Sequence, residues 1–240
     1  MADKPVTHSR SSLTDSQQEV DAFLQAVKDT PPAKSETGRG RLVFSLDATA
    51  SRQRTWDRAM SLQQDMFTNT RGIGALDVQL VYYRGFDECR ASKWLSDADK
   101  VVGMMRKVSC MAGTTQIHRV LKHALAESRA RPVQALVFIG DCIEEDVDQL
   151  GNLAGQCRLL NMPVFIFQEG HDRRASQAFK QLASLSGGAH CRFDESSARA
   201  LGDLLNAVAA YAAGGKSALR ALEKQGSKEA VALLEQIDGK

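Results

Sequence analysis

The segment ALVFIGD (residues 135–141) is uncharged and almost wholly apolar up to its final aspartate, without alternation of apolar and polar positions. A strand with one solvated face alternates, so a strand of this kind is expected to be buried on both faces. LVFSL (42–46) and PVFIFQEG (163–170) have a similar composition. A sheet that is covered on both faces needs helical connections, and this requirement constrains the fold more than any other feature of the chain.

Segments with helical spacing of apolar residues separate these strands. They cover residues 52–69, 97–110, 115–130, 145–160, 172–186 and 196–213. Further strands are expected at 77–85 and 188–193, with a short edge strand at SKWL (92–95). Strands joined by helices run parallel through right-handed crossovers. The pattern therefore predicts an α/β, Rossmann-like fold with a doubly wound, mostly parallel sheet of about six strands flanked by helices.

The two ends of the chain differ from this central pattern. Residues 1–40 are expected to form an N-terminal extension, with a short helix at 14–28 and a linker rich in proline and glycine. The main domain is predicted at 41–213. Residues 214–240 are rich in Ala, Leu, Lys and Glu, which favours a C-terminal helical tail.

Composition limits the partners and the compartment. The net charge is +2 and no dense run of Lys or Arg occurs, so nucleic acid is not an expected partner. The sequence has no apolar signal core and no apolar run near the ~18 residues of a membrane span, so a membrane location is not expected. The five cysteines form no CxxC pair, which favours reduced thiols and a cytoplasmic location.

Oxygen-bearing side chains follow the predicted strands. Asp47, Thr49 and Ser51 come after the first strand, Asp141 comes after the strand at 135–140, and Thr115 precedes a helix. Ligands of doubly wound sheets bind beyond the carboxyl ends of the strands, where the winding reverses. If the two strands are neighbours there, Asp47 and Asp141 face each other. Two facing carboxylates repel unless a cation or a proton lies between them.

This donor set predicts the metal. Oxygen ligands without His or Cys favour Mg²⁺, Mn²⁺ or Ca²⁺ over zinc, and Mg²⁺ is our first expectation, with Mn²⁺ as the alternative. Thr114, Glu144, Glu145 and Arg84 are candidates for the rim of the site. The alternative interpretation is structural: Ser51, Thr114 or Thr115 as helix N-caps, and Glu144 and Glu145 as the acidic first turn of a helix.

The motifs DATAS, GTTQI and VFIGD together resemble the von Willebrand factor A (VWA) domain with its metal-ion-dependent adhesion site (MIDAS), over about residues 41–213. The family pattern is Asp-x-Ser-x-Ser, then a Thr, then an Asp. The resemblance implies that Thr49, Ser51 and Thr115 contact the metal and that Asp47 and Asp141 act mostly through water. It also implies an antiparallel edge strand at SKWL. Thr49 replaces the usual Ser, and Cys142 stands where the family has Gly.

The same resemblance implies a function. A divalent ion held by neutral hydroxyls keeps much of its Lewis acidity, and its open position attracts an acidic oxygen from another protein. The expected function is a non-enzymatic, metal-dependent protein-interaction module of the bacterial cytosolic type, whose partner protein offers an Asp or Glu. By analogy with other cytosolic VWA proteins, the partner is expected in an ATPase or chaperone assembly. The oligomeric state is not predicted.

The competing hypothesis is a Mg²⁺-dependent phosphatase of the haloacid-dehalogenase-like type. Asp47 would then be the nucleophile, with Gly140-Asp141 and Asp146 holding the metal. Three features disfavour it. Ser51 leads directly into a predicted helix and leaves no room for a cap, no Lys occupies a clear phosphate-binding position, and GTTQI has no role in that mechanism.

Overall fold

Six strands form a single sheet in the order β3-β2-β1-β4-β5-β6. They are β1 (Gly40–Asp47), β2 (Leu76–Arg84), β3 (Glu88–Ala91), β4 (Ala135–Gly140), β5 (Val164–Glu169) and β6 (His190–Phe193). All neighbouring strands pair in parallel except β2 and β3, which are antiparallel. The chain runs outward from β1 to β3 and returns to the other side of β1 at β4, so the winding reverses between β1 and β4. The predicted fold class is confirmed.

The computed structural model describes residues 39–54, 56, 60, 61 and 76–193. The helices predicted at 14–28 and 196–213, the tail at 214–240 and most of the helix at 52–69 lie outside the described residues. The proposed domain limits therefore stay a prediction.

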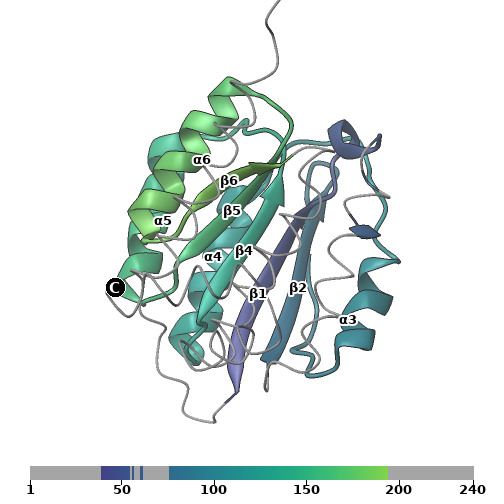
Figure 1. Cartoon of the computed structure of the whole chain (residues 1–240), viewed down its shortest axis with the longest axis vertical. Helices are drawn as coiled ribbons and strands as arrows, with labels where there is room; N and C mark the ends of the chain where they lie inside the picture. Colours follow the sequence, from purple (N-terminus) through teal and green to yellow (C-terminus); the bar gives the residue numbers. More distant parts are fainter. Residues whose placement is uncertain (1–38, 55, 57–59, 62–75, 194–240) are drawn as a thin grey trace, which may run out of the picture.

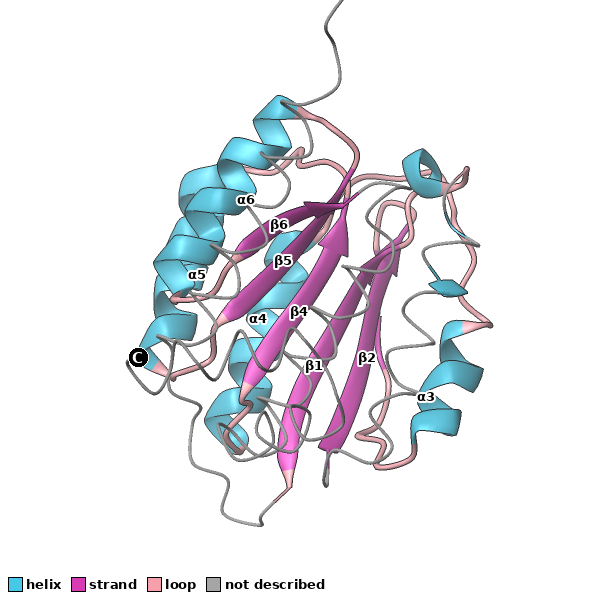
Figure 2. Cartoon of the chain, viewed as in Figure 1, coloured by secondary structure: helices cyan, strands magenta, loops and turns pink. Residues whose placement is uncertain are grey.

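Helices cover both faces of the sheet (Figures 1 and 2). Helix α3 (Ala98–Met105) packs on one face, and α4 (Ile117–Ala130), α5 (Val147–Leu159) and α6 (Arg173–Ser186) pack on the other. Alternate residues of β1 enter the two cores: Leu42 and Phe44 lie in the core with α3, whereas Val43 lies in the core with α4. This two-sided burial explains why the strands lack alternation.

The antiparallel edge strand lies four residues earlier than predicted. Strand β3 is Glu88–Ala91. The predicted segment SKWL contacts β2 only at single points: the N–H of Ser92 donates to the carbonyl of Leu80 at 2.8 Å, and Leu95 forms an isolated bridge with Val78. The chain turns back directly after β2, at Gly85 with φ +60°, and Arg84 pairs with Glu88. The apolar residues of SKWL favoured the wrong segment, because a half-exposed edge strand does not need an apolar composition.

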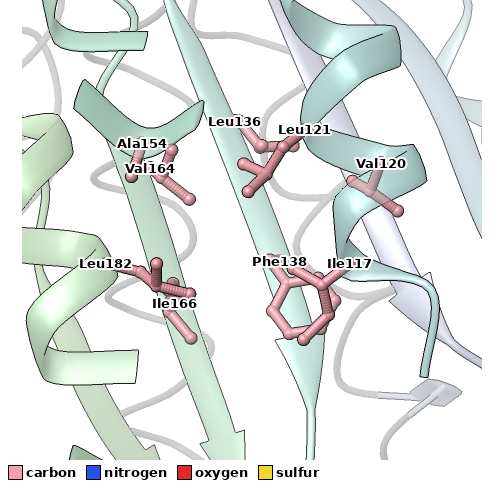
Figure 3. Close-up of a pocket in the computed structure, with 9 residues that line it drawn as sticks. All are labelled: Ile117, Val120, Leu121, Leu136, Phe138, Ala154, Val164, Ile166 and Leu182. Atoms are coloured by element: carbon pink, nitrogen blue, oxygen red, sulfur yellow. The ribbon is translucent and has the colours of Figure 1, made fainter. Parts of the chain in front are cut away.

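A small apolar cavity of about 10 Å³ lies between the sheet and helices α4, α5 and α6 (Figure 3). Leu136 and Phe138 of β4, Ile166 of β5 and Leu182 of α6 are among its lining residues. No polar side chain of the described residues lines it, so it is a gap in the packing rather than a ligand site. In the same part of the chain, no helix is both long and apolar enough to cross a bilayer.

Candidate metal site

The side chains of the DATAS motif form one chain of hydrogen bonds. Asp47, the last residue of β1, is completely buried, and its Oδ1 accepts from the backbone N–H of Thr49 at 2.8 Å and from the Thr49 hydroxyl at 2.6 Å. The Thr49 hydroxyl also lies 3.0 Å from the Ser51 hydroxyl. Thr49 is buried and Ser51 is exposed, so this chain of oxygens runs from the core to the surface.

The other oxygen of Asp47 is held by Tyr83. This tyrosine pairs with Asp47 in the parallel register of β1 and β2, is completely buried, and donates its hydroxyl to Oδ2 at 2.9 Å. Sequence reasoning did not assign this role to Tyr83, because the register of two strands far apart along the chain is not visible in either strand alone.

Asp141 lies beside Asp47, because β4 is the neighbour of β1. A carboxylate oxygen of Asp47, a carboxylate oxygen of Asp141 and the Cys142 sulfur all lie within 4.8 Å of one another. Oδ1 of Asp141 is buried and makes no hydrogen bond with any residue that the structure describes. A buried carboxylate oxygen without a donor is costly. A divalent cation between the two carboxylates would remove that cost, and these residues therefore fit a metal.

Thr115 is fixed against the loop that follows Asp141. Its hydroxyl accepts from the backbone N–H of Glu144 at 3.1 Å, and its own N–H donates to the Glu144 carboxylate at 2.9 Å. Ile117, two residues later, is buried in the core, as the register of GTTQI predicted. The two loops that carry Thr115 and Asp141 are thus joined by a reciprocal pair of hydrogen bonds.

Glu145 caps a helix other than its own. Its carboxylate accepts from the N–H groups of Ile117 and His118 at the start of α4, at 2.6 and 2.8 Å. Helix α5 begins at Val147 with Asp146 as its N-cap, so Glu144 and Glu145 precede it. The interpretation of these two glutamates as an acidic first helical turn is wrong.

The remaining rim candidates lie on the adjoining loops. Thr114 is exposed and donates its N–H to the carbonyl of Gly85 at 3.2 Å. Arg84 forms an ion pair with Glu88 at 2.9 Å and donates to the carbonyl of Ser109 at 3.1 Å. Both residues lie where the β2–β3 turn meets the loop before α4.

Gly113 makes this meeting of loops possible. A Cβ at this position would lie 1.9 Å from the carbonyl oxygen of Gly85. The next loop contact is a hydrogen bond of 3.0 Å from the N–H of Met111 to the carbonyl of Ala48, directly after β1. The glycine of GTTQI is therefore required by backbone packing between the loops.

An unexpected buried ion pair lies behind the site. Arg52 is 1% exposed, donates from Nε to Glu169 at 2.8 Å, and donates from Nη1 to the backbone carbonyl of Asp47 at 2.5 Å. It ties the end of β1 to the end of β5. No local sequence signal identifies this pair, because Glu169 becomes a neighbour only through the order of the strands.

Burial raises the pKa of several acidic groups in the site, because it disfavours their negatively charged forms. Burial raises the pKa of Asp47, and the hydrogen bonds from Thr49 and the charge of Arg52 oppose this effect. Burial, the charges of Asp141 and Asp47, and a hydrogen bond of the thiol with the Asp141 side chain raise the pKa of Cys142 to about 12. Burial and the Asp47 charge raise the pKa of Tyr83 well above its ordinary value. A cation would stabilise every one of these anionic forms.

Asp146 does not join this cluster. Its carboxylate accepts from the N–H groups of Asp148 and Gln149, at 2.9 and 3.1 Å, as the N-cap of α5. The phosphatase hypothesis needs this carboxylate on the metal, so the observed cap counts against that hypothesis.

No protein-family model matches the chain, and no curated protein does. Among solved structures, an aerotolerance-related membrane protein from Bacteroides fragilis is 15% identical, with a TM-score of 0.55 over 70% of this chain and 98% of that chain. The VWA domain of SpRpn10 is 13% identical, with a TM-score of 0.53 over 69% of this chain and 94% of that one. Proximal thread matrix protein 1 from the mussel byssus, solved with a zinc-occupied MIDAS motif, is 14% identical, with a TM-score of 0.59. That match covers 72% of this chain and 46% of the byssus protein.

These likenesses concern the fold. At such low identity they show that the chain has a VWA-like α/β fold. They leave its ligand and its partner to be argued from its own residues.

Proposed function

We propose that this chain is a metal-dependent protein-interaction module, which presents a divalent cation to an Asp or Glu of a partner protein. The hydroxyls of Thr49, Ser51 and Thr115 are the proposed direct ligands. Asp47 and Asp141 are proposed to bind the ion mostly indirectly, through water. Mg²⁺ is the expected ion for the oxygen donors, with Mn²⁺ as the alternative.

The observation that carries this proposal is the pairing of Asp47 and Asp141. Both carboxylates lie at the point where the winding of the sheet reverses, with ligand atoms within 4.8 Å, and Oδ1 of Asp141 is buried without a donor from the described residues. An arrangement of this kind is unfavourable unless a cation or a proton lies between the two carboxylates, and a cation is what we propose.

The exposure of the DATAS side chains increases along the motif, which supports an ion that remains accessible to a partner rather than one enclosed by the protein. Asp47 is 0% exposed and Thr49 is 3% exposed, whereas Ser51 lies at the surface. The ion would have protein on one side and solvent on the other. The VWA-like fold and a neighbour whose MIDAS motif holds zinc are consistent with this role.

The proposal extends to the setting in which the module acts. We place it in the cytoplasm as a non-catalytic subunit that works with an ATPase or chaperone. The five cysteines all lie in the described part of the chain and are free thiols, which agrees with a reducing compartment.

Calorimetric titration of Mg²⁺ tests the site. Wild-type protein is expected to bind one ion, and Asp47→Ala is expected to lose the binding heat. Asp148→Ala is the matched control, because Asp148 is an exposed aspartate on α5 and should bind as the wild type does. Circular dichroism checks that each variant is folded. Equal heats in wild type and Asp47→Ala would refute the site.

Capture of partners from a cell lysate tests the interaction. A partner that is retained with Mg²⁺ and released by a chelator supports metal-dependent adhesion. A partner that is retained in the presence of the chelator places the interaction on another surface and contradicts the proposed function.

A further inference from the structure

Cys142 is the residue of the site that the oxygen-only donor set leaves out. It follows Asp141 directly, is half-buried, and its sulfur is one of the three ligand atoms that lie within 4.8 Å of one another. Among the His, Cys, Asp and Glu residues that the structure describes, this is the group whose geometry could hold a metal ion.

The position of the sulfur changes the chemistry of the site. Hard cations such as Mg²⁺ take oxygen ligands, whereas thiolates favour zinc and other softer divalent ions. The expectation of Mg²⁺ rested on a set of donors without sulfur. With Cys142 within reach of both carboxylates, that premise does not hold for this chain.

A second observation indicates that the cluster is built for a ligand. Oδ1 of Asp141 is buried and has no hydrogen-bond donor in the described part of the chain. Both oxygens of Asp47, in contrast, are held by neutral donors, Thr49 and Tyr83, which fix the carboxylate without neutralising it. The cluster thus combines one fixed carboxylate, one unsatisfied carboxylate oxygen and one sulfur.

We propose that Cys142 is a direct ligand of the bound cation and that it shifts the preference of the site from Mg²⁺ towards Zn²⁺ or a similar transition-metal ion. This inference rests on the cation site of the proposed function and deepens it. The sulfur binds as a thiolate, so a bond forms between the metal and sulfur while the thiol proton leaves to solvent. No electron is transferred.

A thiolate ligand also bears on how the site works. It adds a negative charge to the ion's surroundings, so the ion is held more firmly before any partner arrives. Purified protein should therefore retain a transition-metal ion through dialysis against metal-free buffer.

Titration with Co²⁺ alone, in the presence of a phosphine reductant, reports the metal–sulfur bond directly. Wild-type protein is expected to develop the near-ultraviolet charge-transfer band of a cobalt thiolate. Cys142→Ser and Cys142→Gly are expected to lack this band. Cys89→Ser is the matched control, because Cys89 is also a half-buried thiol but lies outside the three-residue cluster, and it should keep the band.

Calorimetry with Zn²⁺ and with Mg²⁺ gives the selectivity. Cys142→Ser should weaken Zn²⁺ binding by at least roughly 10–100-fold, because that is the loss seen when a group that only supports a metal ligand is replaced. Its Mg²⁺ affinity should match that of the wild type.

The outcomes separate this inference from the proposed function. Asp47-dependent Mg²⁺ binding without a cobalt–thiolate band overturns the inference and leaves the function standing. A band that disappears in Cys89→Ser, or survives in both Cys142 variants, also overturns it. A cobalt–thiolate band that depends on Cys142, together with a partner that is still captured in the presence of a chelator, supports the inference and contradicts the proposed function. Failure of every metal to bind refutes both.

Discussion

At the scale of single residues, the site depends on how a buried carboxylate is kept charged and in place. Asp47 is completely buried, yet its oxygens receive three hydrogen bonds, two from Thr49 and one from Tyr83. These donors are neutral and therefore do not cancel its charge. The charge of Arg52 offsets part of this negative charge, but its guanidinium donates to the backbone carbonyl of Asp47 rather than to the carboxylate. The carboxylate oxygens therefore remain able to attract a cation.

We expect Tyr83→Phe to destabilise the protein by about 1–3 kcal/mol, because it removes a donor from a buried carboxylate oxygen. The measurement is urea denaturation in the presence of a chelator. Tyr82→Phe is the control: its hydroxyl makes a longer contact of 3.3 Å with Glu88 and is partly exposed, so the change should be small. Equal losses in the two variants would contradict the role of Tyr83.

Glu127, at the opposite end of the sheet, is in contrast held by a charged donor as well as by neutral ones. Its Oε2 accepts from Trp94 Nε1 at 2.8 Å and from Arg41 at 3.1 Å. Burial raises the pKa of Glu127, but the hydrogen bonds from Trp94 and Gln79 and the nearby positive charges outweigh it, and the net pKa lies below the ordinary value of 4.5.

This lowered pKa predicts an acid-dependent loss of stability. The stabilising contribution of Glu127 is complete above its unfolded pKa and is lost as the pH falls through its lower folded pKa. Glu127→Gln should therefore be less stable at neutral pH and should lose less stability on acidification. Urea denaturation over a pH series measures both effects. Parallel pH profiles for the two proteins would exclude this contribution.

At the scale of elements, loops from different parts of the chain hold the site together. The loop before α5 supplies the cap of α4 through Glu145, and its Glu144 exchanges two hydrogen bonds with Thr115. A carboxylate at a helix N-terminus is favourable because the free N–H groups and the helix dipole point towards it. The loop that caps α4 therefore also positions Thr115, one of the residues proposed to bind the metal.

We expect Glu145→Ala to lower stability by about 0.5–2 kcal/mol, as the loss of an N-cap does. Thermal or urea denaturation measures the loss. Asp148→Ala is the matched control, since Asp148 lies exposed in the first turn of its own helix and should cost less. If Asp148→Ala costs as much as Glu145→Ala, the capping role of Glu145 is not supported.

Gly113→Ala tests the contact between loops. A Cβ there would overlap the backbone of Gly85, so the loop that carries Thr115 must move. We expect a lower Mg²⁺ affinity in calorimetry and a lower melting temperature. In Gly103→Ala, on α3, the added Cβ meets no described atom within 4 Å. This control should keep its affinity and gain roughly 0.5–1 kcal/mol, as expected for Gly to Ala in a helix. Wild-type affinity in Gly113→Ala would show that the loop tolerates the shift.

At the scale of the whole molecule, two apolar cores on either side of one sheet hold the fold together. The core under α4, α5 and α6 contains the small cavity of Figure 3, which Leu182 and Val164 help to line. An imperfectly filled core is sensitive to any change that enlarges the gap.

Leu182→Ala is expected to cost about 2–5 kcal/mol, because it adds to an existing cavity that the rigid sheet cannot collapse. Val164→Ile, which adds one methylene at the same cavity, should change stability by about 1 kcal/mol or less. Urea denaturation measures both. A larger loss in Val164→Ile than in Leu182→Ala would show that no usable space exists there.

Much of the fold could be predicted because its cause is local. Strands buried on both faces must be apolar throughout, and the segments at 42–46, 135–141 and 163–170 follow this rule. The edge strand was misplaced because an exposed edge imposes no such composition. Glu88–Ala91 pairs through its backbone, and its side chains carry no pattern that predicts a strand.

The site was predictable only in part, for a related reason. Asp47, Thr49 and Ser51 lie within one short segment, and their hydrogen bonds are local. The donor to Asp47 from β2 and the buried Arg52–Glu169 pair join segments that only the order of the strands brings together. The role of Glu145 as a cap of α4 depends in the same way on how two loops meet.

The sequence by itself therefore determined the order of strands and helices and the kinds of side chain that follow each strand, because burial and local hydrogen bonding act over a few residues. The expectation that Asp47 and Asp141 face each other depended on their strands being neighbours, and the tertiary structure decided this, because β4 pairs with β1 only once the winding of the sheet reverses. It also decided that Cys142 joins them. That meeting adds a sulfur to a set of oxygen donors, and the charge and softness of the resulting cluster decide which cation it would hold.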